Sequence, residues 1–245
     1  MLKGRIHSIE TMGLLDGPGI RTVFFLQGCP LRCKYCHNPD TWHQGGEEYT
    51  VDELVSFAKR YRPYYKKTGG VTFSGGEALM QGEFVLEAIK ALKKENIHVA
   101  LDTSGVGQTQ FYDEILRLVD VLLLDIKHYD AAEYRDLTGV SMKWTKSFME
   151  SLKQYKNKIW IRHVMVPGVT DNYYAMNQLL SSVHVYIKNI EKIEILPYHR
   201  LGVDKYSELG ISYLLNDVPE MDKTQAEMYQ DYVMNQLMHQ KSIAV

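Results

Sequence analysis

The chain has 245 residues, of which 45% are hydrophobic and 24% are charged, as in an ordinary globular protein. Its formal net charge of −2 provides none of the basic character of a nucleic-acid-binding face, so nucleic acid is not an expected ligand. A chain of this length suits one large domain or two small ones and can bury a core without disulfides.

Nothing in the sequence points to a membrane or to export. Residues 1–7 contain no apolar core long enough for a secretory signal. The apolar run Val121–Leu124 is much shorter than the ~20 residues that span a bilayer. We therefore expect a soluble cytoplasmic protein with no membrane partner.

Short β-branched and aromatic runs alternate with helical patterns along the whole chain. The first half is expected to contain, in order, a strand at Ile20–Gln27, a helix from the capping box Thr50–Glu53 to about residue 61, a strand at Val71–Ser74, a helix at about 84–94, a strand at Ile97–Asp102 and a helix at about 111–119. The second half is expected to contain strands at Val121–Ile126, Ile159–Val166 and Ile193–Leu196, with helices at about 145–156, 172–188 and 222–238.

This alternation predicts an α/β fold of parallel strands joined by crossover helices. A full eightfold barrel takes ~250 residues, so six units with sizeable loops indicate a partial, open (β/α)6 barrel. No linker or repeat marks a boundary, and residues 1–245 are expected to form a single domain. The charged, weakly patterned segment Tyr129–Trp144 is interpreted as a mobile loop over the mouth of the barrel.

Polar motifs follow every predicted strand. Because barrel enzymes build their active sites from the loops at the carboxyl ends of the strands, this placement indicates an enzyme. The motifs, in chain order, are Gly28-Cys29, Ser74–Glu77, Asp102–Gly105, Asp125–Lys127, Arg162 with Pro167-Gly168, and Pro197–His199.

The three cysteines of the chain all lie within one short segment, as Cys29, Cys33 and Cys36. Clustered cysteines in a cytosolic protein indicate metal or redox chemistry rather than chance core positions. A structural zinc site needs four ligands and would have to recruit His37. An iron–sulfur cluster with three protein thiolates leaves one iron open to a substrate, so a catalytic [4Fe–4S] cluster is favoured while zinc remains the alternative.

The spacing Cys-x3-Cys-x2-Cys, with Tyr35 before the third cysteine, resembles the signature of the radical S-adenosylmethionine (SAM) superfamily. Further motifs are similar, end to end, to the activating enzymes of glycyl radical enzymes. Many relatives carry a ferredoxin-like insert with additional cysteines after this loop. In this chain the segment between Trp42 and Thr50 is short and has no cysteine, which favours the branch that acts on pyruvate formate-lyase. The motifs are Asp16–Arg21, Tyr35–Trp42, Ser74–Ala78, Trp160–Arg162 and Val166–Gly168.

The resemblance implies the partial (β/α)6 barrel that the strand and helix pattern predicts. It also implies a radical reaction that begins with the cleavage of SAM. An electron enters the cluster, SAM is cleaved to methionine and a 5′-deoxyadenosyl radical, and that radical removes a hydrogen from a glycine Cα of pyruvate formate-lyase (formate C-acetyltransferase). It also implies anaerobic glucose fermentation and a flavodoxin or ferredoxin as electron donor; we expect a monomer. The alternatives are an activase of another glycyl radical enzyme, a radical SAM enzyme with a small-molecule substrate, and a non-catalytic metal-binding interaction protein.

The resemblance also assigns site residues. Cys29, Cys33 and Cys36 are the expected cluster ligands, and Asp16 and Arg162 are expected to contact the incoming glycine loop. Asp102 and Thr103 are candidates for a monovalent-cation site. The expected SAM contacts are Tyr35, Cys36, His37, Gly75, Gly76, Glu77, Asp125, Ile126, Lys127 and His199.

Several of these residues also have ordinary structural interpretations. The glycine pair could be a simple strand-to-helix turn, and Asp16-Gly-Pro-Gly a plain β-turn. Lys127 could be a solvated surface lysine, and His199 an ordinary loop histidine. Asp102 could cap the turn that follows it.

Overall fold

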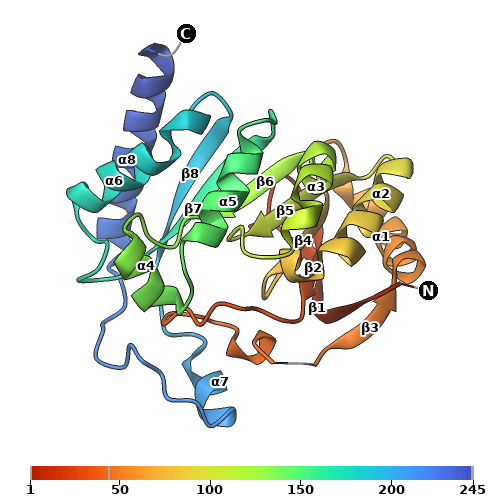
Figure 1. The fold of residues 1–245 in the computed structure, drawn as a ribbon, viewed down its shortest axis with the longest axis horizontal. Helices are drawn as coiled ribbons and strands as arrows, with labels where there is room; N and C mark the ends of the chain where they lie inside the picture. Colours follow the sequence, from red (N-terminus) through yellow and green to blue (C-terminus); the bar gives the residue numbers. More distant parts are fainter. Residues whose placement is uncertain (1, 44, 244–245) are drawn as a thin grey trace. The chain divides into compact units, whose positions relative to one another are not determined.

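The computed structural model describes residues 2–43 and 45–243, which contain eight strands and eight α-helices (Figure 1). They divide into two compact units. The first unit is Met1–Pro30, Thr41–Leu124 and Lys143–Lys158, and the second is Leu31–Asp40, Asp125–Met142 and Ile159–Val245.

The first unit is built on a mixed sheet. Its strands are β1 (Lys3–Gly13), β2 (Arg21–Leu26), β3 (Glu47–Thr50), β4 (Gly70–Gly75), β5 (His98–Thr103) and β6 (Val121–Asp125). Strands β2, β4, β5 and β6 are neighbours in that order and run parallel. Strand β1 pairs antiparallel with both β2 and β3, so it extends the parallel sheet beyond β2.

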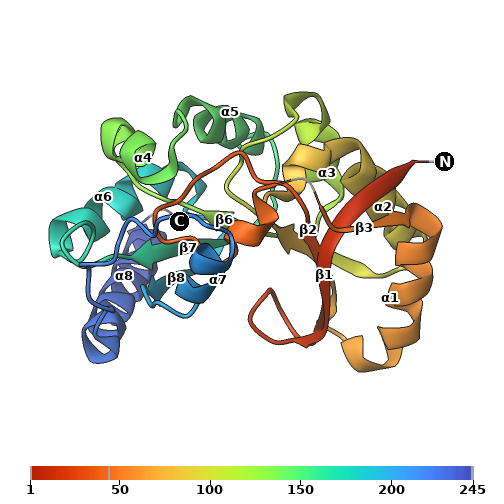
Figure 2. The ribbon, with the colours of Figure 1, turned by 90° about the horizontal axis from the view of Figure 1, so that it is seen from below.

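The helices of the first unit are α1 (Val51–Tyr65), α2 (Gly82–Lys94), α3 (Tyr112–Leu118) and α5 (Lys143–Leu152). Helix α2 contacts both α1 and α3, and this row of three is visible in Figures 1 and 2. The predicted capping box of α1 is confirmed, because the Thr50 hydroxyl accepts from the Glu53 amide and the Glu53 carboxylate accepts from the Thr50 amide. The predicted apolar stripe of α2 is also buried: Phe84, Val85, Ala88, Ile89 and Leu92.

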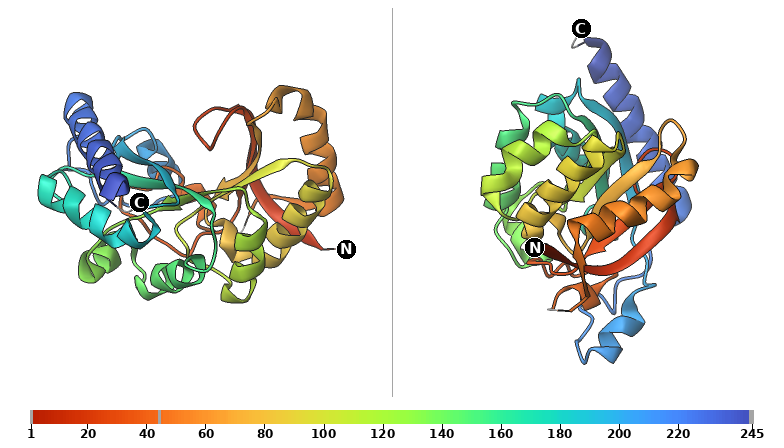
Figure 3. Two further views of the ribbon diagram at one scale, coloured as in Figure 1. Left: turned by 90° about the horizontal axis from the view of Figure 1, so that it is seen from above. Right: turned by 90° about the vertical axis from the view of Figure 1, so that its right-hand side faces the viewer.

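The second unit contains a parallel pair of strands, β7 (Lys158–Met165) and β8 (Ile190–Pro197). Its long helices are α6 (Tyr173–Val183) and α8 (Lys223–Ile243), which lie side by side in Figure 3. Helix α8 packs along β8, where Gln230 accepts from the Ile195 amide and donates to the Ile193 carbonyl, both at 2.7 Å. This side chain satisfies β8 backbone groups that a neighbouring strand would otherwise pair.

All six predicted strands and six predicted helices are present, with shifted ends. Helix α5 stops at Leu152, and α6 stops at Val183 before a 3-10 turn at His184–Tyr186. Strands β1 and β3 and the short helix α7 (Val203–Glu208) lie outside the elements expected from the sequence. No helix in the ranges that the structure describes has the length and apolar character needed to cross a membrane.

The interpretation of Tyr129–Trp144 as a loop is wrong, because helix α4 (Ala131–Thr138) lies within it. Asp130 caps the helix by accepting from the amides of Ala132 and Glu133, and Gly139 ends it at φ 75°. The helix buries Tyr134, Leu137 and Thr138. Two caps and three buried residues are enough for a helix held by packing, although they are too short a pattern to recognise in the sequence.

Candidate functional site

The cysteine segment begins where β2 ends. In the first unit, the Gly28 amide donates to the Thr41 carbonyl at 2.9 Å, and Gly28 has a φ of 99°, which favours glycine. In the second unit, the Cys36 amide donates to the Cys33 carbonyl at 3.0 Å and closes a tight turn. The carbonyls at the end of α4 accept from the amides of Arg32 and Lys34, so the missed helix holds this turn in place.

The three thiols differ in exposure. Cys33 is 8% exposed, whereas Cys29 and Cys36 are half-buried, and none of the three forms a disulfide in the described structure. Burial raises the pKa of Cys33 to about 12, although the nearby charge of Lys127 opposes the shift. A thiol in such a position is inert unless a metal replaces its proton.

Within the described ranges, no three His, Cys, Asp or Glu side chains converge to hold a single metal ion. A mononuclear zinc site requires such convergence of its ligands on one point. A cluster does not, because each thiolate binds a different iron. The cluster and its three ligands stay a prediction, with zinc as the alternative.

The glycine pair after β4 lies directly against the start of the cysteine segment. The Gly76 amide donates to the Leu26 carbonyl and the Glu77 amide to the Gly28 carbonyl, each at 2.9 Å. A Cβ at Gly76 would collide with the Gly28 carbonyl and lie 3.2 Å from the Cys29 Cβ. The missing side chain thus allows a backbone approach that a simple strand-to-helix turn would not require.

The side chain of Glu77 points inward and is 2% exposed. Its carboxylate accepts from the Thr103 hydroxyl, from the amide and hydroxyl of Ser104, and from the Leu79 amide. Burial raises the pKa of Glu77, while these hydrogen bonds oppose the shift. With both oxygens bonded inside the protein, Glu77 is suited to holding the glycine turn rather than to contacting a ligand.

The candidate cation residues lie at the end of β5. Asp102 Oδ2 accepts from the Ser74 hydroxyl at 2.7 Å. The Thr103 hydroxyl donates to Glu77 and accepts from the Gly105 amide at 2.9 Å. The cation site stays a prediction, and its side-chain donor would be Asp102, because the Thr103 hydroxyl is already bonded twice.

Asp125 and Lys127 form an ion pair in the second unit, with Oδ2 and Nζ 2.6 Å apart and side chains 22% and 15% exposed. Burial by itself would lower the pKa of Lys127, but the Asp125 carboxylate holds it well above its usual value. Burial would raise the pKa of Asp125, but Lys127 and Arg162 keep it low. The alternative of a solvated surface lysine is therefore wrong.

Ile126, between these two charges, is tied to β7 by both backbone groups. Its amide donates to the Arg162 carbonyl at 2.9 Å, and its carbonyl lies 2.7 Å from Nδ1 of His163. Ile126 thus anchors the ion pair to the strand. His163, which the sequence analysis did not single out, is buried, and burial lowers its pKa to about 4.

The rings of His37 and His199 stack with centroids 3.9 Å apart and planes inclined by 14°. His37 Nε2 lies 3.0 Å from the His199 carbonyl, and a Cβ at Gly202 would collide with the His37 backbone. Burial lowers the pKa of His37, which favours its neutral form. Two stacked flat rings offer a surface suited to an aromatic base.

Two residues of α7 that the sequence analysis missed support this region. The Tyr206 hydroxyl donates to the Cys36 carbonyl at 3.0 Å. Lys205 Nζ donates to Asn38 at 2.9 Å and to Asp40 at 3.0 Å. Neither residue is recognisable in the sequence, because a helix of 6 residues carries no useful hydrophobic period. Their partners also lie more than 160 residues away along the chain.

Tyr35 also turns inward. Its ring centroid lies 5.9 Å from Lys127 Nζ, and its buried hydroxyl has no hydrogen-bond partner among the described residues. A buried hydroxyl normally finds such a partner, so this group is suited to one supplied by a bound molecule.

Asp16 and Arg162 belong to different units. Asp16 is half-buried in the loop between β1 and β2, and its carbonyl accepts from the Thr72 hydroxyl at 2.6 Å. Arg162 lies on β7, in register with Glu194 on β8. The proposed contact of both with a partner's glycine loop stays a prediction.

Known proteins are similar to this chain in sequence and in fold. The model of the radical SAM superfamily matches residues 23–179. Pyruvate formate-lyase-activating enzyme of Clostridium pasteurianum is 48% identical over 95% of this chain and 98% of its own length. The enzyme of that name from Staphylococcus epidermidis is 45% identical over 94% of this chain and 95% of its own length.

Structure comparison agrees on the fold. Streptococcus suis SuiB, solved with bound SAM, aligns with a TM-score of 0.62 at 15% identity over 86% of this chain and 45% of its own. The similarity lies in the α/β architecture, which is consistent with the expected partial barrel. The chain therefore belongs to the radical SAM superfamily and, within it, to the family of pyruvate formate-lyase-activating enzymes.

Proposed function

We propose that this protein activates pyruvate formate-lyase by converting one of its glycines into a glycyl radical, with SAM and a [4Fe–4S] cluster as cofactors. The observation that carries the proposal is the side-chain-free Gly75-Gly76 turn packed against Cys29, in a chain 48% identical to a pyruvate formate-lyase-activating enzyme. In that place the turn can meet a molecule bound at an open iron.

The residues present fit the cluster. Cys29, Cys33 and Cys36 would hold it, since three thiols are available and the buried Cys33 needs a metal to ionise. When bound, the cluster supplies the electron that cleaves SAM into methionine and a 5′-deoxyadenosyl radical. The protein's own contribution is to place SAM and the glycine and to exclude water.

Each candidate side chain has a role in that placement. Gly75 and Gly76 bring backbone close to the methionine part of SAM, and Glu77 holds their turn. Asp125 and Lys127 offer a fixed pair of opposite charges to the polar groups of SAM, and Ile126 anchors that pair. His37 and His199 offer flat rings to the adenine, next to Cys36, and Tyr35 offers an unsatisfied hydroxyl.

The partner is a protein, pyruvate formate-lyase, whose glycine loop contacts Asp16 and Arg162. Each turnover consumes an electron from outside the protein, so a small donor such as flavodoxin or ferredoxin is required. We place the enzyme in the cytoplasm and expect it to act as a monomer. We also propose that a monovalent cation binds beside Asp102.

The test is anaerobic reconstitution with iron and sulfide, followed by reduction in the presence of SAM and purified pyruvate formate-lyase. We expect 5′-deoxyadenosine by chromatography and a glycyl doublet by electron paramagnetic resonance. Cys33→Ala is expected to abolish both, whereas Ser181→Ala, on an exposed face of α6, keeps both.

Three results would contradict the proposal. One zinc per chain without sulfide would indicate a structural metal site. Cleavage of SAM without a doublet on pyruvate formate-lyase, but with one on another glycyl radical enzyme, would reassign the partner. Unchanged SAM cleavage in Cys33→Ala would remove the cluster assignment altogether.

A further inference from the structure

Five tyrosines gather on the second unit, near the starts of α6 and α8 and in the loop after β6. The ring of Tyr173 meets those of Tyr229 and Tyr232 edge-on, with centroids 5.1 and 4.9 Å away. The ring of Tyr174 meets that of Tyr129 at 6.1 Å. We call these five residues the tyrosine patch.

The outer part of the tyrosine patch is open to solvent. Tyr174 is 66% exposed and Tyr173 is 48% exposed. Met228, one helical turn before Tyr232 on α8, is 52% exposed and extends the patch. Single exposed apolar side chains are common on any surface, whereas contiguous aromatic ones are typical of a protein interaction site.

Hydrogen bonds on the inner side hold the patch in shape. The Tyr229 hydroxyl donates to the Asp171 carbonyl at 2.8 Å, and the Tyr232 hydroxyl donates to Asn177 Oδ1 at 2.8 Å. These bonds fix rings of α8 against α6 and the segment before it. Rings that are ordered before a partner arrives lose little conformational entropy when it binds.

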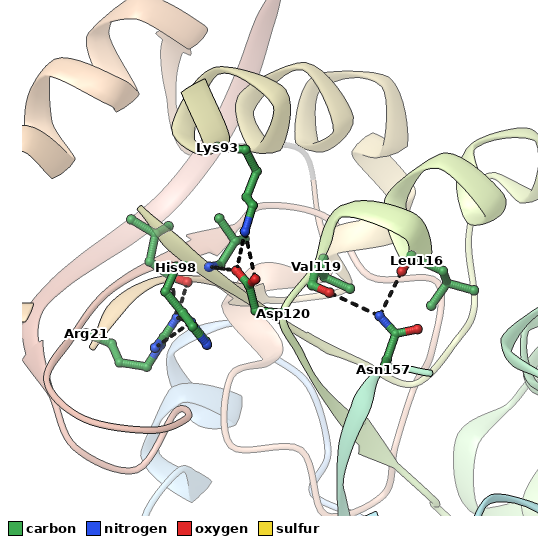
Figure 4. Close-up of polar contacts among 9 residues, drawn as sticks. Arg21, Lys93, His98, Leu116, Val119, Asp120 and Asn157 are labelled. Carbon is green, nitrogen blue, oxygen red and sulfur yellow. Dashed lines mark hydrogen bonds and ion pairs between the residues drawn. The ribbon is translucent and has the colours of Figure 1, made fainter. Parts of the chain in front are cut away.

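Carboxylates surround the patch. Segments 128–135, 171–178 and 222–232 carry six carboxylates against one arginine and one lysine. None of the six pairs with a lysine or arginine of the described chain, whereas Asp120 of the first unit is bonded to Lys93 at 2.7 Å (Figure 4). The patch therefore keeps its negative charge. The six are Asp130, Glu133, Asp171, Asp222, Glu227 and Asp231.

Exposed tyrosine rings among unpaired carboxylates are suited to cations. Guanidinium and ammonium groups lie favourably over aromatic faces and pair with carboxylates. The same charge repels nucleic acid and anionic lipid. The chemistry of the patch thus fits a protein segment that carries arginine and lysine side chains.

The patch begins beside the proposed site. Tyr129 follows Lys127 by two residues, so their Cα atoms are at most about 8 Å apart. From Tyr129 the rings continue through Tyr174 onto the first turn of α6. A protein that presents a glycine next to the Asp125–Lys127 pair is large enough to cover this surface as well.

We propose that the tyrosine patch and its carboxylates bind an arginine- or lysine-rich segment of the protein substrate that lies outside its glycine loop. The inference rests on the proposed function. It adds to that function a second contact surface, on α6 and α8, and the charge of the partner segment that this surface receives.

The test compares two substrates of the reconstituted enzyme, intact pyruvate formate-lyase and a short synthetic peptide that carries only its glycine loop. Tyr174→Ser removes the most exposed ring of the patch, and Tyr174→Phe retains it. We expect Tyr174→Ser to raise the KM for intact pyruvate formate-lyase about three- to tenfold, the effect of one lost cation–π contact, and to leave the KM for the peptide unchanged. Tyr174→Phe should match the wild type with both substrates. So should Tyr64→Ser, the matched control on α1, where Tyr64 is 50% exposed.

A second variant tests the charge without removing a ring. Glu227→Gln combined with Asp231→Asn should raise the KM for intact pyruvate formate-lyase at low salt and make it less dependent on ionic strength, because salt screens the attraction that the substitutions remove. SAM cleavage without a protein substrate should stay at the wild-type rate in every variant. A merely structural role would lower thermal stability and raise the KM for both substrates.

The proposal is overturned if the KM for intact pyruvate formate-lyase stays within about twofold of wild type in both Tyr174→Ser and the double carboxylate variant. It is also overturned if the KM for the peptide rises as much as that for the intact enzyme, or if Tyr174→Ser changes only self-association in sedimentation. Failure of the proposed function is distinguishable, because the wild-type enzyme would then form no glycyl doublet, and the patch proposal would fail with it. Failure of the patch alone leaves the wild-type doublet intact.

Discussion

Two hydrogen bonds join Ser104 to Glu77, and both end on the same carboxylate oxygen: the Ser104 amide lies 2.8 Å and its hydroxyl 2.6 Å from Oε2. The other oxygen accepts from the Leu79 amide and the Thr103 hydroxyl. One buried carboxylate thus connects the residues after the glycine turn with the end of β5. The position of the turn beside Cys29 depends on this connection.

Replacing Glu77 by glutamine should destabilise the protein. The amide NH2 would face a donor where the carboxylate now accepts, so we expect Glu77→Gln to lower the free energy of unfolding by about 1–3 kcal/mol. Urea unfolding measures this change. Glu83→Gln, on the exposed face of α2, is the matched control and should change stability by less than about 0.5 kcal/mol. Equal effects in the two variants would contradict the role of Glu77.

Removing Lys127 should leave Asp125 as an unpaired, largely buried charge. We expect Lys127→Met to cost about 2–4 kcal/mol of unfolding free energy, and the double variant with Asp125→Asn to recover part of that loss. Lys153→Met breaks the exposed pair with Glu150 and should cost no more than about 0.5 kcal/mol. The comparison is a double-mutant cycle by chemical unfolding. Additive losses in the double variant would show that Asp125 and Lys127 are not coupled.

Acid should destabilise the protein partly through His163. Because its pKa is lowered to about 4 in the folded protein, the unfolded chain binds a proton more readily, and stability falls as the pH drops from about 6.5 towards 4. Between pH 7 and pH 5 this group contributes a loss of about 2 kcal/mol. His37, His98 and His128 shift in the same direction.

The contribution of His163 is separable by substitution. His163→Leu should reduce the difference in unfolding free energy between pH 7 and pH 5, whereas His239→Leu, on the exposed end of α8, should leave it as in the wild type. An unchanged difference in His163→Leu would contradict a lowered pKa of His163 in the folded protein.

Alanine substitutions at Gly76 and Gly168 distinguish the effect of a steric clash from the effect of backbone strain. A Cβ at Gly76 would collide with the Gly28 carbonyl, so Gly76→Ala should displace the turn and slow 5′-deoxyadenosine formation about 100-fold. Gly168 has a φ of 75° with open space around it, so Gly168→Ala should cost about 1 kcal/mol of stability and leave that rate within about twofold. Equal rates in the two variants would contradict the close approach at Gly76.

Local patterns predicted the regular elements well. The alternation of strand and helix periods gave six strands and six helices, and the capping box of α1 has the expected hydrogen bonds. The elements it missed are β1, the edge strand β3 that pairs with it, and two short helices. Strand β1 has alternate residues exposed or half-exposed, and α4 and α7 are 8 and 6 residues long, so neither carries a hydrophobic period of useful length.

The sequence by itself determined the cysteine spacing, the missing fourth ligand and the polar residues after each strand, because these are properties of neighbours along the chain. Tertiary structure decided which of those residues are turned inward. Glu77 bonds to Thr103 26 residues away, and His199 stacks on His37 although 162 residues separate them. Such partners are set by packing between distant segments, and a local period encodes which face is buried but not what lies against it.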